Sequence, residues 1–263
     1  METVRTAEMS WRQVEEVVAR GAAAIFPLAS TEEHGPHAPT GDYLATDVIA
    51  ERVAQQSGDV MFPTLPFGYS EYFRHYPGTI TLGSETLFRV VEDVVECIIG
   101  HGFKHIALFN GHNGNDAILI QLSRKIRRKH GLMVPVVAPF AFAMTPQLVK
   151  ELYGDNPIGH GAEPMGSIMM HLRPETVQMD RVEDWATREV HGLKPANLNG
   201  LRFEGVTIGF PLNMEDITPP SGSLSDPNLA SAERGKRIID ESVTRLVRFM
   251  NWFKNIDSRV EAG

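Results

Sequence analysis

Apolar positions follow two alternating patterns over the first 140 residues of the chain. Short continuous apolar runs are typical of buried strands, whereas apolar residues repeated at helical spacing are typical of amphipathic helices. This alternation predicts an α/β fold in which helices cover both faces of a mostly parallel sheet. The predicted strands are 22–29, 60–65, 105–109 and 133–138. The predicted helices are 10–20, 43–56, 84–99 and 116–130.

The remainder of the chain is less regular. Residues 190–225 are rich in glycine, proline and asparagine, which indicates loops or short antiparallel strands. A long final helix is predicted to start near 225–227, with Pro227 in its first turn, and to run to about Phe253. No linker, repeat or low-complexity tract interrupts the sequence, so we expect a single domain over residues 1–263.

Composition narrows the classes of protein that the chain can represent. Of its 263 residues, 42% are hydrophobic and 22% charged, which is typical of a globular protein with a sizeable core. The net charge of −8 argues against nucleic acid or an anionic membrane as the main partner. Cys97 is the only cysteine, which excludes an intramolecular disulfide and fits a reducing compartment. We therefore expect a cytoplasmic globular protein, and the expectation of a small-molecule substrate comes from the motifs below.

The first polar cluster, residues 30–42, directly follows the first predicted strand. Ligands bind at the carboxyl ends of strands in such a sheet. Glu32 and His34 are two residues apart, so in extended chain they point to the same side. Carboxylate with imidazole is a usual ligand set for zinc, manganese or iron, and His37 and Asp42 follow on the same loop. The alternative is a polar loop with incidental charges.

The second cluster, residues 110–115, follows the strand 105–109. Glycines flank His112 and allow a close approach to a ligand, which favours a metal-binding or substrate-binding histidine. A phosphate-binding turn at a helix N-terminus is the alternative. The glycine spacing matches neither the dinucleotide-binding nor the nucleotide-triphosphate-binding signature.

Two further segments carry candidate chemistry. His160 and Glu163 can act as proton donor and acceptor, or Glu163 can bind metal, although Glu163 and Ser167 can also simply begin a helix. The loop 73–79 can line a pocket through His75 and Tyr76, or be an ordinary turn. We expect four side chains to contact the substrate: His37, His75, Tyr76 and Asn113.

Together, these motifs resemble the creatininase (creatinine amidohydrolase) family from about residue 20 to 170. The resemblance is carried by 32–37 (EEHGPH) with Asp42 downstream, 110–115 (NGHNGN) and 160–163 (HGAE), supported by 66–68 and 76–79. It implies a three-layer α/β/α sandwich, metal ligands at Glu32, His34, Asp42 and His112, and assembly into homo-oligomers, often hexamers. It further implies that Asp42 bridges two metals and that His160 lies near the substrate.

Several positions depart from the family pattern. The loop before Asp42 is one residue shorter than usual, which leaves Asp47 as the alternative ligand. Gly114 stands where creatininase itself has a glutamate, so the second metal requires another ligand, with Glu163 as the candidate, or the site holds one ion. Met165 stands where many relatives have a second glutamate. These departures argue against creatinine as the substrate.

The sequence thus predicts a hydrolase that uses one or two divalent ions (Zn, Mn or Fe) and a metal-activated water. We expect the water to attack a carbonyl of a small polar, cyclic amide, opening the ring by C–N cleavage, with His160 or Glu163 protonating the leaving group. The family resemblance also covers C–C cleavage of cyclic ketone sugars, deformylation of formamides and peptide processing. An oxidoreductase or lyase on the same metal site and a non-catalytic binding subunit are alternatives of other classes.

Overall fold

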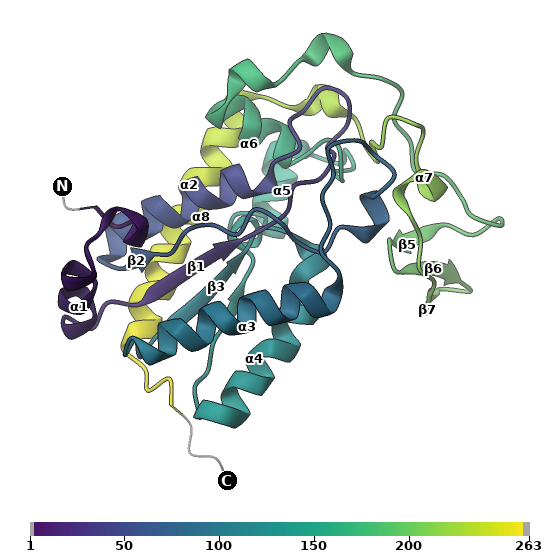
Figure 1. Ribbon diagram of the computed structural model, residues 1–263. Helices are drawn as coiled ribbons and strands as arrows, with labels where there is room; N and C mark the ends of the chain where they lie inside the picture. The colour runs from purple at the N-terminus through teal and green to yellow at the C-terminus, as the bar shows by residue number, and fades with distance from the viewer. Residues whose placement is uncertain (1–2, 260–263) are drawn as a thin grey trace.

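The computed structural model describes residues 3–259, and at its centre lies a four-stranded parallel sheet (Figure 1). The strand order is β2-β1-β3-β4, so β1 and β3 lie side by side, paired in register from Ala24 with Ile106 to Leu28 with Asn110. The predicted parallel sheet is confirmed. Its strands are β1 (Ala24–Leu28), β2 (Val60–Met61), β3 (Ile106–Asn110) and β4 (Val136–Val137).

The two edge strands are much shorter than the apolar runs that predicted them. The run 60–65 forms a strand only at Val60–Met61, with one isolated bridge from Leu65 to Leu28, and the run 133–138 forms a strand only at Val136–Val137. Proline has no N–H to donate to a neighbouring strand. Pro63 lies inside the first run and Pro135 directly before the second strand, so both runs continue as extended loops rather than as sheet.

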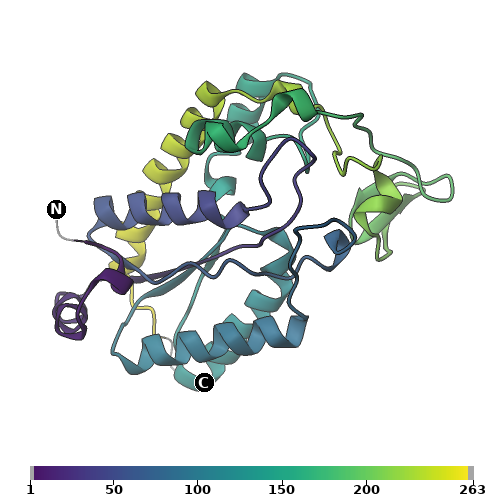
Figure 2. The same ribbon diagram turned by 45° about the horizontal axis from the view of Figure 1, so that its top comes forward.

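Helices cover both faces of the sheet, as the alternation predicted. Alternate residues of β1 point to opposite faces: Phe26 packs in a core with α1, α3 and α4, whereas Ile25 packs in a core with α2 and α8. Figure 2 shows α2 and α3 on opposite sides of the sheet. These helices are α1 (Trp11–Ala19), α2 (Asp42–Ser57), α3 (Ser84–Gly100), α4 (Asp116–His130) and α8 (Ala232–Lys254).

The long final helix begins later than predicted. Pro227 lies in a separate single 3-10 turn, Pro227–Leu229, and the helix α8 starts at Ala232. The side chain of Ser231 accepts a hydrogen bond from the backbone N–H of Arg234 and so caps the helix. The proline thus begins the preceding turn, and the serine is the N-cap of the helix. Two shorter helices pack on the same face of the sheet, α5 (Pro146–Tyr153) and α6 (Met165–Leu172).

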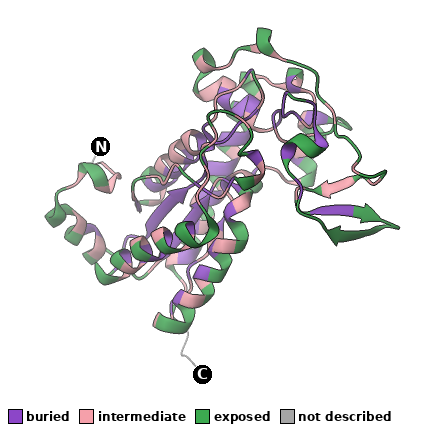
Figure 3. Cartoon of the chain, turned by 45° about the vertical axis from the view of Figure 1, so that its right-hand side comes forward, coloured by how far each residue is buried: buried purple, intermediate pink, exposed green. Residues whose placement is uncertain are grey.

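A small antiparallel sheet lies beyond the carboxyl ends of β1 and β3 (Figure 1). The glycine- and proline-rich segment 190–225 forms it, together with the short helix α7 (Met214–Ile217). Leu201 and Met214 pack against Phe73 in a core of their own, and Figure 3 shows that one outer strand of this sheet, Val206–Gly209, is exposed. The strands are β5 (Pro195–Asn197), β6 (Gly200–Phe203) and β7 (Val206–Gly209).

No helix within residues 3–259 is long and apolar enough to cross a membrane.

Candidate metal centre

Four buried side chains meet where the two central strands end. Glu32 and His34 follow β1, His112 follows β3, and Asp42 is the first residue of α2. The sheet brings them together because β1 and β3 are adjacent and parallel, so their carboxyl ends lie at the same edge. All four side chains are almost fully buried.

Each carboxylate faces an imidazole at short range. Nδ1 of His112 lies 2.9 Å from Oε2 of Glu32 and 3.5 Å from Oδ2 of Asp42. Nε2 of His34 lies 2.8 Å from Oδ1 of Asp42. Asp42 therefore directs one oxygen to each histidine, which is the arrangement expected of a carboxylate shared between two metal positions.

Hydrogen bonds to backbone carbonyls set the protonation of both rings. Nε2 of His112 lies 2.9 Å from the carbonyl oxygen of Tyr69, and Nδ1 of His34 lies 3.1 Å from that of Glu32. A carbonyl oxygen only accepts, so these nitrogens carry the hydrogen, and in the neutral rings the opposite nitrogens present lone pairs to the carboxylates. Ser70 in turn donates to Oε2 of Glu32 at 2.6 Å. Such support of metal ligands by outer groups is common in metal sites.

The electrostatics of the cluster favour a bound cation. Burial lowers the pKa of His34, but the charge of Asp42 and its hydrogen bond to the ring outweigh burial and raise the pKa to about 9. Burial opposes ionisation of Asp42, yet the two histidines hold its pKa well below the usual range. The buried carboxylates thus hold protons on the neighbouring rings. A divalent cation satisfies the same carboxylates, and two carboxylates with two imidazoles fit zinc, manganese or iron.

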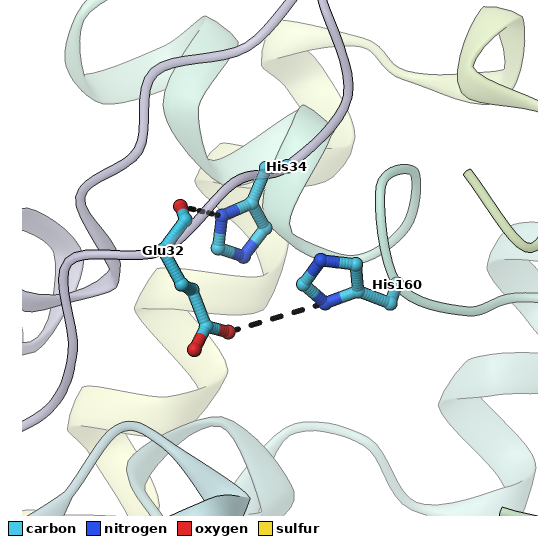
Figure 4. Close-up of side chains that lie close together, drawn as sticks. All are labelled: Glu32, His34 and His160. Carbon is cyan, nitrogen blue, oxygen red and sulfur yellow. Dashed lines mark hydrogen bonds and ion pairs between the residues drawn. The ribbon is translucent and has the colours of Figure 1, made fainter. Parts of the chain in front are cut away.

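His160 joins this cluster from the loop before α6. Nδ1 of His160 lies 4.0 Å from Oε1 of Glu32, and the His160 and His34 rings are 4.7 Å apart (Figure 4). Glu33 binds the other nitrogen of this ring. Nε2 of His160 lies 2.8 Å from the Glu33 carbonyl oxygen and 3.0 Å from its Oε1. The ring also stacks on Phe73 with a centroid separation of 4.2 Å.

Within residues 3–259, two groups of side chains place one possible ligand atom each within 4.8 Å of one another. One group is Glu32, Asp42 and His112, and the other is Glu32, His34 and His160. Glu32 is common to both groups.

Glu163 lies elsewhere in the same cavity and belongs to neither group. Its Oε2 accepts a hydrogen bond from the hydroxyl of Tyr153 at 2.6 Å, and its Oε1 accepts one from Ser167 at 2.9 Å. Burial raises the pKa of this carboxyl group despite the two hydrogen bonds. The cavity, of about 460 Å³, is also lined by apolar side chains. These include Phe140, Met144, Ile158, Met165 and Leu198.

The structure separates the two aspartates that the sequence offered as ligands. Asp42 lies in the cluster, whereas Asp47 pairs with Arg5 at 2.7 Å and accepts a hydrogen bond from Thr64 at 2.6 Å. The shorter loop therefore still delivers Asp42 to the other ligands, because Gly41 and Asp42 begin α2 at the sheet edge.

The four predicted substrate contacts lie in different places. Asn113 lines the cavity and is exposed. His37 is buried outside the cavity lining, and neither ring nitrogen has a hydrogen-bond partner among the described residues. His75 and Tyr76 line a separate cavity together with Glu215.

Sequence reasoning missed the groups that support the cluster. Glu33 lies inside the first motif, and its carboxylate was visible there between Glu32 and His34. Tyr69, Ser70 and Tyr153 belong to no motif, and only the folded chain shows that they contact His112, Glu32 and Glu163.

Comparison with known proteins shows the family to which this chain is similar. The family model described as "Creatininase: Creatinine amidohydrolase" matches residues 7–250. The creatinine amidohydrolase of Pseudomonas putida is 29% identical over 92% of this chain and 94% of its own. The 3-dehydro-scyllo-inosose hydrolase of Thermotoga maritima is 27% identical over 97% and 84%. A mycofactocin precursor peptide peptidase of Mycobacterium tuberculosis is 28% identical over 86% and 85%.

Solved structures show the same fold. A mutant creatininase described as of Zn-Zn type superposes with a TM-score of 0.83 at 26% identity, covering 97% of this chain and all of the other. A structure described as "Creatininase Mn" gives a TM-score of 0.80 at 26% identity over the same shares.

Proposed function

This chain belongs to the creatininase family and is a hydrolase, and we propose that it is a metal-dependent hydrolase of a small polar substrate that carries a carbonyl group. The observation that carries the proposal is the convergence of Glu32, His34, Asp42 and His112 at one edge of the sheet. Such a buried set of two carboxylates and two imidazoles suits one or two ions of zinc, manganese or iron. The zinc and manganese creatininase structures support the same metals.

Glu32, His34, Asp42 and His112 would hold a divalent ion, which would supply a water activated as a nucleophile at neutral pH and a Lewis acid for the substrate carbonyl. The chain's own contribution is positional. In the neutral rings, the carbonyls of Tyr69 and Glu32 hold the hydrogen on one nitrogen of His112 and one of His34, so the opposite nitrogen can bind a metal that displaces the second proton.

Proton transfer to the leaving group requires an acid in the same cavity. His160 and Glu163 are the two candidates, and both line the cavity. The raised pKa of Glu163 keeps a larger fraction of this carboxyl group protonated than an exposed glutamate would be. A carboxylic acid with such a pKa is suited to donate a proton to a departing nitrogen.

The proposed substrate is a cyclic amide that is opened by C–N cleavage. Polar groups of the metal centre and Asn113 line the cavity together with apolar side chains, and this mixture suits a compact ring with one polar edge. His37, His75 and Tyr76 remain proposed substrate contacts. None of them lines this cavity, so direct contact with a substrate bound there would require their loops to adopt another arrangement. Met165 and Gly114, which stand in place of acidic residues, argue against creatinine itself.

Two other substrate classes fit the same site. The inosose hydrolase of T. maritima favours C–C cleavage of a cyclic ketone sugar, and a formamide offers the same carbonyl to the same water. A non-catalytic subunit that binds metal or a small molecule is the alternative from another class.

The test is a screen of the metal-loaded protein against cyclic amides, formamides and cyclic ketones, each with zinc, manganese and iron. We expect turnover of cyclic amides that disappears on chelation and returns when the metal is added back. Turnover that is unaffected by complete metal removal contradicts the proposal. Absence of turnover for all three classes, with metal bound, favours the non-catalytic alternative.

We further propose that the enzyme acts as one domain, in the cytoplasm, and as a homo-oligomer, with the hexamer as the form that the family resemblance implies. The lone cysteine supports the compartment, and the family supports the assembly. Light scattering on the purified protein gives the oligomeric state directly, and a monomer at micromolar concentration contradicts this part of the proposal.

A further inference from the structure

We propose that His160 is a ligand of a second metal ion, which it holds together with Glu32 and His34, and that Glu33 orients it for this role. The inference rests on the proposed metal-dependent function and adds a ligand that sequence reasoning had assigned to proton transfer.

The loop after β3 leaves a second ion short of ligands. His112 is the one imidazole of this loop, and the residue two positions later is Gly114, which has no side chain. A Cβ atom built on Gly114 would lie 2.3 Å from the Tyr69 carbonyl oxygen and 2.4 Å from Nε2 of His112. The backbone is packed so closely here that this position accepts no side chain, so a further ligand has to come from another segment.

His160 lies within reach of such a position. Metal–ligand bonds of about 2.1 Å allow two donor atoms on one ion to lie up to about 4.2 Å apart. Nδ1 of His160 and Oε1 of Glu32 are 4.0 Å apart and so meet this limit. By contrast, Glu163 is bound to Tyr153 and Ser167 and is in neither candidate ligand group.

The two carboxylates divide their oxygens between two positions. Oε2 of Glu32 faces His112, whereas Oε1 faces His160. Oδ2 of Asp42 faces His112, whereas Oδ1 faces His34. The donor atoms therefore form two sets, with His112 in one and with His34 and His160 in the other, and the carboxylates connect them.

Glu33 fixes which nitrogen of His160 faces the cluster. Nε2 donates to the carbonyl oxygen of Glu33 at 2.8 Å, and the Glu33 carboxylate lies at 3.0 Å. The neutral ring therefore carries its hydrogen on Nε2 and presents the lone pair of Nδ1 to Glu32. Carboxylate–histidine–metal arrangements of this kind orient the ring and strengthen it as a ligand.

The carboxylate of Glu33 is itself held in place. It accepts a hydrogen bond from the N–H of Gly35 at 2.8 Å, and a Cβ atom on Gly222 would lie 2.6 Å from it. Glu33 is thus a positioning residue, and His160, committed to binding metal, leaves Glu163 as the proton donor of the cavity.

The test counts metal ions. Apoprotein is dialysed to equilibrium against Mn²⁺, and manganese per chain is measured by elemental analysis, with electron paramagnetic resonance to detect the spin coupling of paired ions. We expect two coupled ions in the wild type and one uncoupled ion in His160→Phe, which keeps a ring against Phe73 but removes both nitrogens. Glu163→Gln is the matched control in the same cavity and should keep both ions.

Circular dichroism shows whether His160→Phe is folded. A milder substitution tests the inference in case that variant misfolds. Glu33→Gln keeps an acceptor for His160 without the charge and should weaken only the second ion, about 10–100-fold in affinity. Two coupled ions in folded His160→Phe, an unchanged second affinity in Glu33→Gln, or a single ion in the wild type overturns the inference and leaves the proposed function standing. A wild type that binds no ion overturns the proposed function itself.

Discussion

Nδ1 of His112 lies 2.9 Å from Oε2 of Glu32, although the two residues follow different strands of the sheet. The contact exists because β1 and β3 are adjacent and parallel and release their loops at the same edge. Both side chains are buried, so neither carboxylate nor imidazole has bulk water as an alternative partner. The pairing makes a preformed cation site the simplest account of why these polar groups are buried together.

Asp42 and Asp47 offer a matched pair of isosteric substitutions. Asp42 faces both histidines of the cluster, whereas Asp47 is bound to Arg5. We expect Asp42→Asn to lose most of the bound metal and Asp47→Asn to retain it, as measured by elemental analysis of dialysed protein. The assignment of Asp42 as a ligand is wrong if the two variants retain equal amounts of metal.

The Arg5–Asp47 pair predicts a pH-dependent contribution to stability. Burial raises the pKa of Asp47, but hydrogen bonds from Arg5 and Thr64 outweigh it and lower the pKa below the usual value. A lowered folded-state pKa stabilises the protein above the unfolded-state pKa, near 3.9, and this stabilisation is lost as the pH falls through the folded-state value.

Urea unfolding of the apoprotein tests this directly. At pH 7, Asp47→Asn should lower the free energy of unfolding by about 1 kcal/mol, since the pair is partly exposed. The difference from the wild type should shrink at pH 3. A difference that is constant between pH 7 and pH 3 would show that the charge of Asp47 does not contribute.

Glu163→Gln separates proton transfer from metal binding. The variant keeps the shape of the buried side chain but cannot donate a carboxylic proton, so kcat should fall by about 10²–10⁴-fold on a substrate with a poor leaving group. Its metal content should match that of the wild type, because Glu163 lies outside both ligand groups. Tyr153→Phe, which removes one hydrogen bond to Glu163, should lower kcat less. Wild-type kcat in Glu163→Gln contradicts the proton-donor role.

Leu198 tests whether the small antiparallel sheet contributes to substrate binding. It lies between β5 and β6 and lines the cavity of the metal centre. Leu198→Ala should raise KM about fivefold by removing about 1 kcal/mol of apolar contact, with metal content unchanged. Val206→Ala on β7, where the side chain is exposed, is the control and should leave KM unaltered. Equal effects of the two substitutions would assign the change to the stability of the sheet instead.

The parts of the fold that depend on local pattern were predictable from the sequence. The helix α3, for example, begins at Ser84 and ends at Gly100, as its apolar stripe and terminal glycines indicate. Predictions failed where proline changed the outcome: Pro63 and Pro135 shorten the edge strands, and Pro227 begins a turn rather than α8. Local apolar runs do not report which backbone groups find a partner strand.

The candidate site was predictable to the extent that its residues are adjacent to strand ends. Glu32, His34 and His112 follow from that position alone. The choice of Asp42 over Asp47 depends on how α2 packs, and the support from Tyr69, Ser70 and Glu33 depends on contacts between distant segments. Pairing over such sequence distances leaves no local periodicity, so no pattern in the sequence could reveal it.

Metal content of the purified chain and of two histidine variants is the most direct test of the central claim, that separate strands bring ligands to a common ion. We predict bound zinc, manganese or iron in the wild type and a large loss of metal and turnover in His34→Ala and in His112→Ala. His75→Ala should keep its metal, because its exposed ring lies outside the cluster. Full metal content and full turnover in either His34→Ala or His112→Ala would contradict the account.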